Sequence, residues 1–407
     1  MTTPQIYVQS RIPAIDSLRV FAILVLVFYH HFIVYVPEWE FHYKIETNWV
    51  WLQHIMILTS PWRMGLLWLI SGIALSFMLA KMTTVQALVK RSSQLLFPLL
   101  VGVLFIVPPQ LYVEMTQAGE MPLNYPDFVY ALFFEQGTLF THFTAGIWPS
   151  IDVNHLWYLR SLWQFTLLAI VLFPIVTTSR IAALLNTLSG KTLYLLGLIF
   201  LLVLAIHYTQ TGNHIREYYG CVWFFTGLLF GRFHSFWHQV KHYAKPLAVL
   251  VLISQISLQL AYAFVWKDEN TPEFLRVFAE MLYIFNRTIM PIAILAIVYK
   301  WFNHRNVEIE RFNVLVFPLY IVHQTISVVV TFLLSLYAPS LTLIQHFVLS
   351  TFIALSLCAC ALSVINTLTL LHPMFGISIT GHSDEFNQKL SIVLLCFSAP
   401  MAFEILF

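Results

Sequence analysis

The sequence predicts an all-α membrane protein, a polytopic transmembrane helical bundle of about 10 to 11 spans. Three observations lead to this prediction. The 407 residues are 59% hydrophobic and only 10% charged, whereas a soluble domain carries about 25% charged residues. The mean hydropathy is +0.77. The apolar runs recur at the length of roughly 20 residues that a helix needs to cross a bilayer.

The predicted spans follow one another along nearly the whole chain. We expect the first to be a retained signal anchor, because it is too long for a signal h-region and lacks a small-residue cleavage site. The longest polar connection, residues 114–153, has a length that is usually functional or contains short helices of its own. The run nearest the C-terminus reaches the last residue. The candidate spans are residues 16–36, 57–80, 94–113, 154–177, 191–208, 218–234, 245–265, 277–300, 312–336, 341–370 and 388–407.

Charge sets the expected orientation and excludes some functions. Most of the 21 Lys and Arg residues fall in one alternate set of connections, and the acidic residues dominate the other set. Because basic connections stay in the cytoplasm, we expect a cytoplasmic N-terminus. The net charge of +2 indicates no nucleic-acid partner. The four cysteines have no CxxC spacing, so no metal site is predicted.

Arg19 and His30 are the most informative side chains, and both lie in the first apolar run, "AIDSLRVFAILVLVFYHHFIVYV". A helix turns about 100° per residue, so the two share one face about 16 Å apart along the axis. Charged residues in a span usually face a polar interior and mark a substrate or ion path. Asp16, one turn before Arg19, is placed to hold its guanidinium. His31 points about 100° away from His30, and we expect it to tolerate replacement.

Five further polar residues lie within or at the edge of predicted spans. For Arg287, structural pairing and substrate contact are both open interpretations, because the cost of a charge in lipid shows only that it has some role. His155 opens a span at the expected outer surface. His323 lies deep in a helix, where a single histidine is more often a hydrogen-bonded packing residue than a ligand. The arginines are Arg63, Arg160 and Arg287.

The residues around Arg19 and His30 resemble a known family. "RIPAIDSLRVFAILVLVFYH" is similar to the first span of the membrane acyltransferase 3 family, whose mark is a basic residue, ten intervening residues and a histidine. Further motifs follow in the family's order: "RMGLLWLISGIALSFML", "LVKRSSQLLFPLL", "NHLWYLRSLWQF", "VFPLYIVHQTI" and "LLHPMFGI". The resemblance covers about 11–376 and is strongest to the branch of the osmoregulated periplasmic glucan succinyltransferases. It divides the chain into an acyltransferase domain, 1–376, and a C-terminal extension, 377–407, with an extra span.

The resemblance implies a membrane-bound O-acyltransferase of the bacterial inner membrane. Such an enzyme moves an acetyl or succinyl group from cytoplasmic acyl-CoA to a hydroxyl of an extracytoplasmic glycan. The expected partners are acyl-CoA, the glycan and membrane lipid, with no permanently bound cofactor. An imidazole with a pKa near 6.5 suits a general base or an acyl carrier at neutral pH.

The candidate site residues take distinct roles under this hypothesis. His30 and Arg19 are catalytic, and Arg19 would bind the donor or stabilise developing negative charge. Asp16 and Ser71 support them. Lys90 and Arg91 are expected to bind the donor, although the second arginine of the family's inner loop is replaced here by Gln94. The expected substrate contacts are Arg63, His155, Arg160, Arg287 and His323.

Two other classes of protein remain open at this stage. A transporter or flippase of a glycan or small anionic solute would also bury Arg, His and Glu, but would more often show repeated halves with broken helices at matching places. A haem or quinone protein would need His30 and His323 at the same depth and facing each other.

Overall fold

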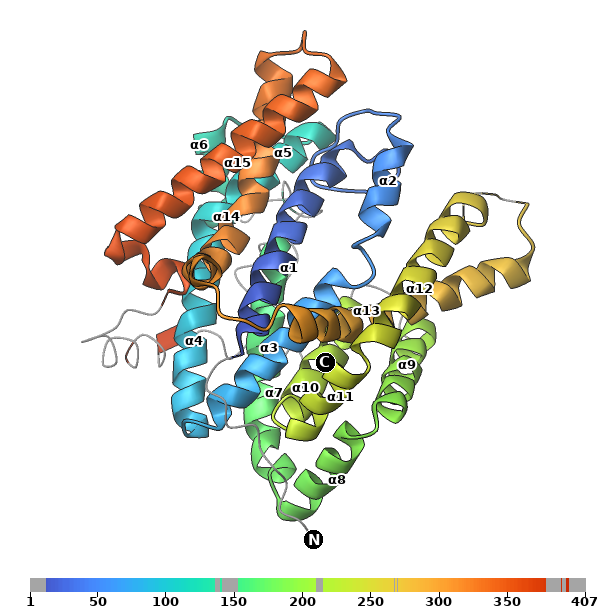
Figure 1. Ribbon diagram of the computed structural model, residues 1–407. Coiled ribbons are helices and arrows are strands. Elements are labelled where there is room, and N and C mark those ends of the chain that lie inside the picture. Colours follow the sequence, from blue (N-terminus) through green and yellow to red (C-terminus); the bar gives the residue numbers. More distant parts are fainter. Residues whose placement is uncertain are drawn as a thin grey trace. The chain divides into compact units, whose positions relative to one another are not determined.

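The computed structural model describes residues 12–135, 140, 153–209, 215–266, 268, 270–377, 389 and 393–394. Within that part of the chain every regular element is a helix (Figure 1), so the prediction of an all-α protein is confirmed. Eight stretches are long and apolar enough to cross a membrane: Pro13–Tyr35, Thr84–Ala118, Asn154–Val176, Thr192–Thr209, Ala244–Phe264, Glu273–Trp301, Val307–Tyr337 and Leu343–Thr367.

The predicted number of spans, 10 to 11, is larger than these eight for identifiable reasons. The expected span 57–80 is the shorter helix α3 (Arg63–Leu79), because residues before Arg63 form the separate helix α2 (Val50–Ile57) and a turn. The expected span 218–234 is α10 (Ile215–Phe230), also shorter than a membrane-length helix. The expected span 388–407 lies outside the described residues, apart from single positions.

The remaining helices follow the predicted apolar runs with small shifts at their ends. α6 is a short helix inside the long connection that was expected to contain one. The amphipathic helices α8 and α11 were not predicted. The bounds are α1 (Pro13–Phe32), α4 (Thr84–Val101), α5 (Val107–Ala118), α6 (Tyr125–Phe134), α7 (Trp157–Val176), α8 (Ser179–Ser189), α9 (Thr192–Thr209), α11 (His234–His242), α12 (Ala244–Phe264), α13 (Glu273–Trp301), α14 (Val307–Tyr337) and α15 (Leu343–Thr367).

The chain forms two compact units. The first comprises Met1–Val25, Gln53–Ala87 and Phe165–Asn313, and the second comprises Leu26–Leu52, Leu88–Gln164 and Val314–Phe407. The helices α1, α4, α7 and α14 each supply residues to both units. Arg19 therefore belongs to the first unit and His30 to the second, although α1 is one unbroken helix.

Close helix packing through glycine characterises the first unit. A Cβ atom at Gly72 of α3 would lie 1.9 Å from the carbonyl oxygen of Phe224, and one at Gly227 of α10 would lie 2.1 Å from that of Leu69. Small residues allow this approach of two backbones, which is how membrane helices gain packing energy without a hydrophobic driving force.

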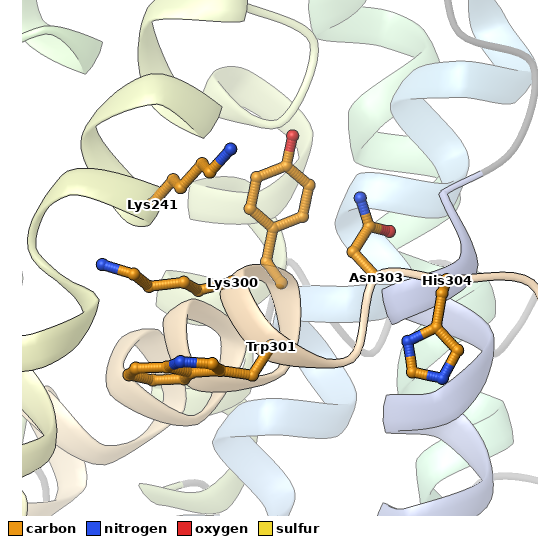
Figure 2. Close-up of a pocket in the computed structure, with 6 residues that line it drawn as sticks. Lys241, Lys300, Trp301, Asn303 and His304 are labelled. Carbon is orange, nitrogen blue, oxygen red and sulfur yellow. The ribbon is translucent and has the colours of Figure 1, made fainter.

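A basic hollow also belongs to the first unit. It lies where α11 and α13 end, and it is lined by Lys241, Lys300, Trp301 and neighbouring polar residues (Figure 2).

Irregular backbone positions polar side chains in the second unit. Between α4 and α5 the chain runs through a π-helical segment, Gly102–Ile106. Gly102 sits against the side chain of Leu156, where a Cβ atom would lie 2.2 Å from Leu156 Cδ1. Asn154, at the start of a single 3₁₀ turn before α7, has a φ of 50°, a left-handed conformation that Asn adopts more readily than most residues. Such irregularities are frequent at functional sites.

Candidate functional site

His30 and His323 form the centre of the candidate site in the second unit. The Nδ1 atom of His30 lies 2.8 Å from the Nε2 atom of His323. The rings are nearly parallel, with an interplanar angle of 6° and centroids 5.1 Å apart. His323 is fully buried in α14, whereas His30, near the end of α1, is partly exposed. Two histidines from distant parts of the chain thus form one hydrogen-bonded pair.

The hydrogen-bond partners assign the protons of this pair. The Nδ1 atom of His323 lies 2.8 Å from the carbonyl oxygen of Tyr320 and 3.1 Å from that of Leu319. A carbonyl oxygen only accepts, so His323 Nδ1–H is the donor and the Nε2 atom of neutral His323 must accept. His30 Nδ1–H therefore donates to His323, and in neutral His30 the Nε2 atom is the unprotonated ring nitrogen. An unprotonated imidazole nitrogen has the chemistry of a base or a nucleophile.

His155 is the third histidine of the cluster. Its ring stands edge-on to His323, with centroids 5.6 Å apart and an angle of 86°. Its Nε2–H donates to the carbonyl oxygen of Ile321 at 2.9 Å. Its Nδ1 atom accepts from the side-chain amide of Gln110 at 3.3 Å. Both ring nitrogens of His155 thus have protein partners, which fix the orientation of its ring.

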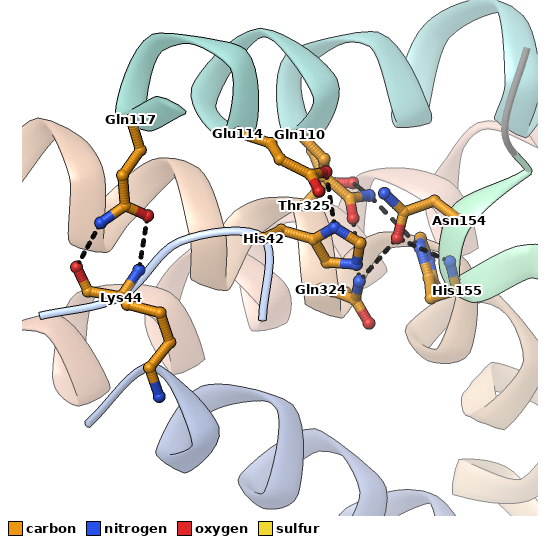
Figure 3. A network of polar contacts seen from close by, with 9 residues as sticks. All are labelled: His42, Lys44, Gln110, Glu114, Gln117, Asn154, His155, Gln324 and Thr325. Carbon is orange, nitrogen blue, oxygen red and sulfur yellow. Dashed lines mark hydrogen bonds and ion pairs between the residues drawn. The ribbon is translucent and has the colours of Figure 1, made fainter. Parts of the chain in front are cut away.

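Side-chain amides extend the polar cluster around His155 (Figure 3). Gln324 Nε2 donates to Gln110 Oε1 at 3.0 Å and to Asn154 Oδ1 at 2.9 Å. Asn154 Oδ1 also accepts the backbone N–H of His155 at 2.8 Å, and Gln110 donates to the hydroxyl of Thr325. Buried polar networks whose members are all satisfied are rigid and specify one arrangement. The histidines are therefore held by a polar framework.

A connection between α1 and α2 is attached to α5 beside this framework (Figure 3). His42 Nδ1 lies 2.7 Å from Glu114 Oε2, and both side chains are partly exposed. The backbone N–H of Lys44 donates to Gln117 Oε1 at 2.8 Å, and Gln117 Nε2 donates to the carbonyl oxygen of Lys44 at 2.6 Å. The same connection places the Phe41 ring 6.1 Å from the His30 ring, centroid to centroid.

Lys44, in the same connection, binds backbone carbonyl groups just after α1. Its Nζ atom donates to the carbonyl oxygen of Ile33 at 2.6 Å and to that of Val36. The ammonium thus binds carbonyl groups in and directly after the 3₁₀ turn Ile33–Tyr35 that follows α1. Burial lowers the pKa of Lys44 to about 8, because the charged ammonium loses solvation there.

Arg19 and Asp16 form the pair that their spacing on α1 predicts, in the first unit. Arg19 Nη1 lies 3.5 Å from Asp16 Oδ1. Asp16 is buried, and its Oδ1 atom also accepts from Asn313 Nδ2 at 3.0 Å. The pairing holds the guanidinium at the beginning of α1, eleven residues before His30 on the same unbroken helix.

The other predicted site residues divide between the two units. Arg287, in the first unit, has its guanidinium 3.9 Å from the centroid of the Tyr219 ring, a cation–π contact that gives it a structural partner. Arg63, which begins α3, and Ser71 also belong to the first unit. Arg160, Lys90 and Arg91 belong to the second unit with the histidines.

Several residues of this site were not found by sequence reasoning. His42, Glu114, Gln110 and Gln324 come from connections and from helix positions that show no periodic signal. Asn154 precedes His155 in "DVNHLWYL", and its left-handed backbone is the one local feature that marks it. For the amides, which are common side chains, the sequence offers no distinguishing signal.

His31 belongs to a second buried polar network of the second unit. It is 3% exposed, and its Nε2 atom lies 3.2 Å from Ser350 Oγ. Ser350 contacts the hydroxyl of Tyr35 at 2.6 Å, which in turn contacts His346 at 2.9 Å. Replacement of His31 would leave buried polar groups without partners. This position argues against the expected tolerance of His31 to replacement.

The geometry of His30 and His323 argues against a haem between them. Two axial nitrogens on one iron lie about 4 Å apart, twice a usual metal–nitrogen distance, and on opposite sides of the metal. The two nitrogens here are in direct hydrogen-bond contact at 2.8 Å. Among the described residues, no group of three or more His, Cys, Asp or Glu side chains is arranged to hold a metal ion.

The eight membrane-length helices of the described residues indicate an integral membrane protein. A family model described as "Acyltransferase domain" (Acyl_transf_3) matches residues 12–364. The chain belongs to this family, so the predicted family membership is confirmed. The family indicates a membrane acyltransferase. No curated protein matches the chain, and no solved structure matches it.

Proposed function

We propose that this protein is an O-acyltransferase that moves an acyl group from cytoplasmic acyl-CoA to a hydroxyl of an extracytoplasmic glycan. The observation that carries the proposal is the contact of 2.8 Å between His30 and His323, in a chain of the acyltransferase family. The proposal includes a bacterial inner membrane location, which the family resemblance favours, and a cytoplasmic N-terminus, which the distribution of Lys and Arg supports.

The proposed chemistry uses the Nε2 atom of His30. As a base, it takes the proton of the acceptor hydroxyl while the hydroxyl oxygen attacks the thioester carbon. The carbon–sulfur bond breaks, and the CoA thiolate leaves with that proton. As a carrier, Nε2 attacks the thioester carbon itself, the carbon–sulfur bond breaks and CoA leaves as its thiolate. The hydroxyl oxygen then attacks the acyl carbon, the acyl–nitrogen bond breaks to restore Nε2, and the hydroxyl proton is released to the thiolate. His323 orients the ring in both routes and accepts from its Nδ1–H throughout.

Positive side chains supply the remaining roles in this proposal. Arg19, held by Asp16, stabilises negative charge on the donor near the cytoplasmic end of α1. Lys90 and Arg91 bind the donor from the basic side, and Ser71 supports the site. The glycan or a succinyl carboxylate contacts residues from the set Arg63, His155, Arg160, Arg287 and His323. The sequence resemblance to glucan succinyltransferases favours succinyl as the acyl group.

The decisive experiment presents labelled donor on one side of a membrane and acceptor on the other. Sealed inside-out vesicles that contain the protein enclose a glucan, and acetyl-CoA or succinyl-CoA with a labelled acyl group is added outside. We expect label on the enclosed glucan from one of the two donors. Mass spectrometry of the glucan identifies the group. Absence of label from both donors would overturn the proposal.

His30→Ala is the matching variant. We expect it to reach the membrane in normal amount and to lose transfer, because its proposed role is chemical. His238→Ala, which removes an exposed histidine of α11, is the control and should retain transfer. Near wild-type transfer by well-expressed His30→Ala would contradict the proposed mechanism. In the absence of acceptor, a burst of one CoA per protein would identify the carrier route.

A further inference from the structure

A basic hollow in the first unit lies apart in sequence from the residues assigned above. It has a volume of about 220 Å³ and lies at the ends of α11 and α13. Figure 2 shows Lys241, Lys300 and Trp301 on one side of it, and Asn303 and His304 on the other. Tyr299 completes the lining.

The lining has the chemistry of a site for an anion. Lys241 and Lys300 bring two ammonium groups from different helices, and none of the six described lining residues is acidic. The nearest acidic residues in sequence, Glu308 and Glu310, form ion pairs with Arg311 at 3.0 Å and with Arg305 at 2.9 Å. The two lysines therefore give the hollow a positive potential.

Asn303 adds oriented donors to this site. Its Oδ1 atom accepts the backbone N–H of Ala14 at 3.1 Å, at the start of the helix that bears Asp16 and Arg19. Because this bond fixes the carbonyl end of the amide toward α1, the Nδ2 group is left to face the hollow that Asn303 lines. The amide thus connects the hollow to the beginning of α1.

Trp301 gives the hollow an aromatic wall. Its ring is partly exposed, and Lys300 Nζ lies 5.4 Å from the ring centroid. Lysines near helix C-termini also interact favourably with the helix dipole. The helix dipole explains why positively charged residues, Lys241 and Lys300, lie at these helix ends. It does not explain the hollow between the two lysines, or the exposed indole and the oriented amide beside them.

We propose that this hollow binds a phosphate group, held between Lys241 and Lys300, with Asn303 as a further donor. Two sources carry this chemistry at a membrane surface. One is a nucleotide such as the adenosine bisphosphate part of CoA, whose base would stack on Trp301. The other is an anionic lipid headgroup, which basic pockets beside transmembrane helices also bind. The nucleotide source would deepen the proposed function and rests on it, whereas the lipid source does not.

The test uses the full-length protein in nanodiscs of phosphatidylcholine. Titration with coenzyme A and with inorganic pyrophosphate measures binding in the first arm. In the second arm, native mass spectrometry counts phosphatidylglycerol retained from mixed vesicles. We expect the double variant Lys241→Gln/Lys300→Gln to lower the affinity for the bound partner about tenfold or more, because hydrogen bonds to charged groups are strong. Lys191→Gln/Lys245→Gln has the same charge change at exposed positions outside the lining and should bind normally.

Trp301→Leu distinguishes the two sources. If a nucleotide is the partner, this variant should lower the affinity for coenzyme A about tenfold through lost stacking and leave the affinity for pyrophosphate unchanged. If a lipid headgroup is the partner, coenzyme A should bind poorly to wild type and phosphatidylglycerol retention should depend on the two lysines. Either result supports the phosphate site.

Protein footprinting keeps the test independent of how the variants fold. On wild type, the bound partner should protect Lys241 and Lys300 from amine acetylation, and should leave Lys191 and Lys245 reactive. Equal labelling of all four lysines with and without each partner would overturn the proposal. The same measurement on the His30→Ala protein separates the phosphate site from the transfer reaction. Protection of the two lysines in this variant, which should not transfer the acyl group, would support the phosphate site whatever the outcome of the acyltransferase assay.

Discussion

The Nδ1 atom of His30 donates a hydrogen bond of 2.8 Å to the Nε2 atom of His323, which is 293 positions further along the chain. His323 in turn donates to backbone carbonyls of its own helix. With both rings neutral, one proton arrangement satisfies this series, and His30 Nε2 is then the unprotonated nitrogen. The relationship gives α14 a direct part in orienting the proposed reactive nitrogen of α1.

His323 is predicted to act as a positioning residue for His30. His323→Leu removes the acceptor for His30 Nδ1–H, and we expect transfer to fall roughly 100-fold or more. His323→Gln keeps a side-chain oxygen that can accept, so it should retain part of the activity. The measurement is kcat and donor KM for the three proteins. A lowered kcat with unchanged KM supports the positioning role, whereas equal loss in both variants with reduced folded protein would indicate packing alone.

Arg19 and Asp16 are predicted to have separable roles. Arg19→Ala should remove transfer, and Arg19→Lys should retain only part of it, because a point charge replaces a planar set of donors. Asp16→Asn should be milder because the cation remains. Expression and transfer are measured separately for each variant.

The Asp16→Asn/Arg19→Ala double variant distinguishes a role of this pair in donor binding from a purely structural role. Normal expression with lost transfer in Arg19→Ala supports the donor role. If instead each single change lowers the yield of folded protein and the double change restores it, the pair is structural, because removal of one partner leaves a buried charge uncompensated.

Gly227 is predicted to be essential for packing α3 against α10. Gly227→Ala would place a Cβ atom 2.1 Å from the carbonyl oxygen of Leu69, so the two backbones must separate. Overpacking of this kind costs about 1–3 kcal/mol, and we expect a lower melting temperature in detergent. Gly197→Ala on α9 is the control, because a Cβ atom there meets nothing within 4 Å. Equal melting temperatures for the two variants would contradict this packing.

Lys44 is predicted to titrate near pH 8 in the folded protein. Its unfolded pKa is about 10.4, so between these values the unfolded chain binds a proton that the folded chain does not. The contribution of Lys44 to stability should therefore rise as the pH increases from about 8 to 10.4. Competitive amine labelling against pH measures the pKa directly. Comparison with Lys44→Met should show a flatter pH dependence of melting in the variant over that window.

Part of the fold followed from the sequence because membrane helices satisfy their backbone locally. A helix in lipid must make its own hydrogen bonds and present apolar side chains, so length and composition locate it. α1, α12 and α13 therefore begin and end within a few residues of the predicted runs. Short helices such as α10, with 16 residues, and amphipathic ones such as α11 carry a weaker signal.

The site was predictable only where its residues share one helix. The pairing of Asp16 with Arg19 and the common face of Arg19 and His30 depend on helical periodicity alone, which the sequence contains. The hydrogen bond from His30 to His323, the amides around His155, and the contact of His42 with Glu114 join residues far apart in the chain. Tertiary packing alone decided these, because a hydrogen bond needs two atoms within about 3 Å, and periodicity says nothing about the neighbours of a helix.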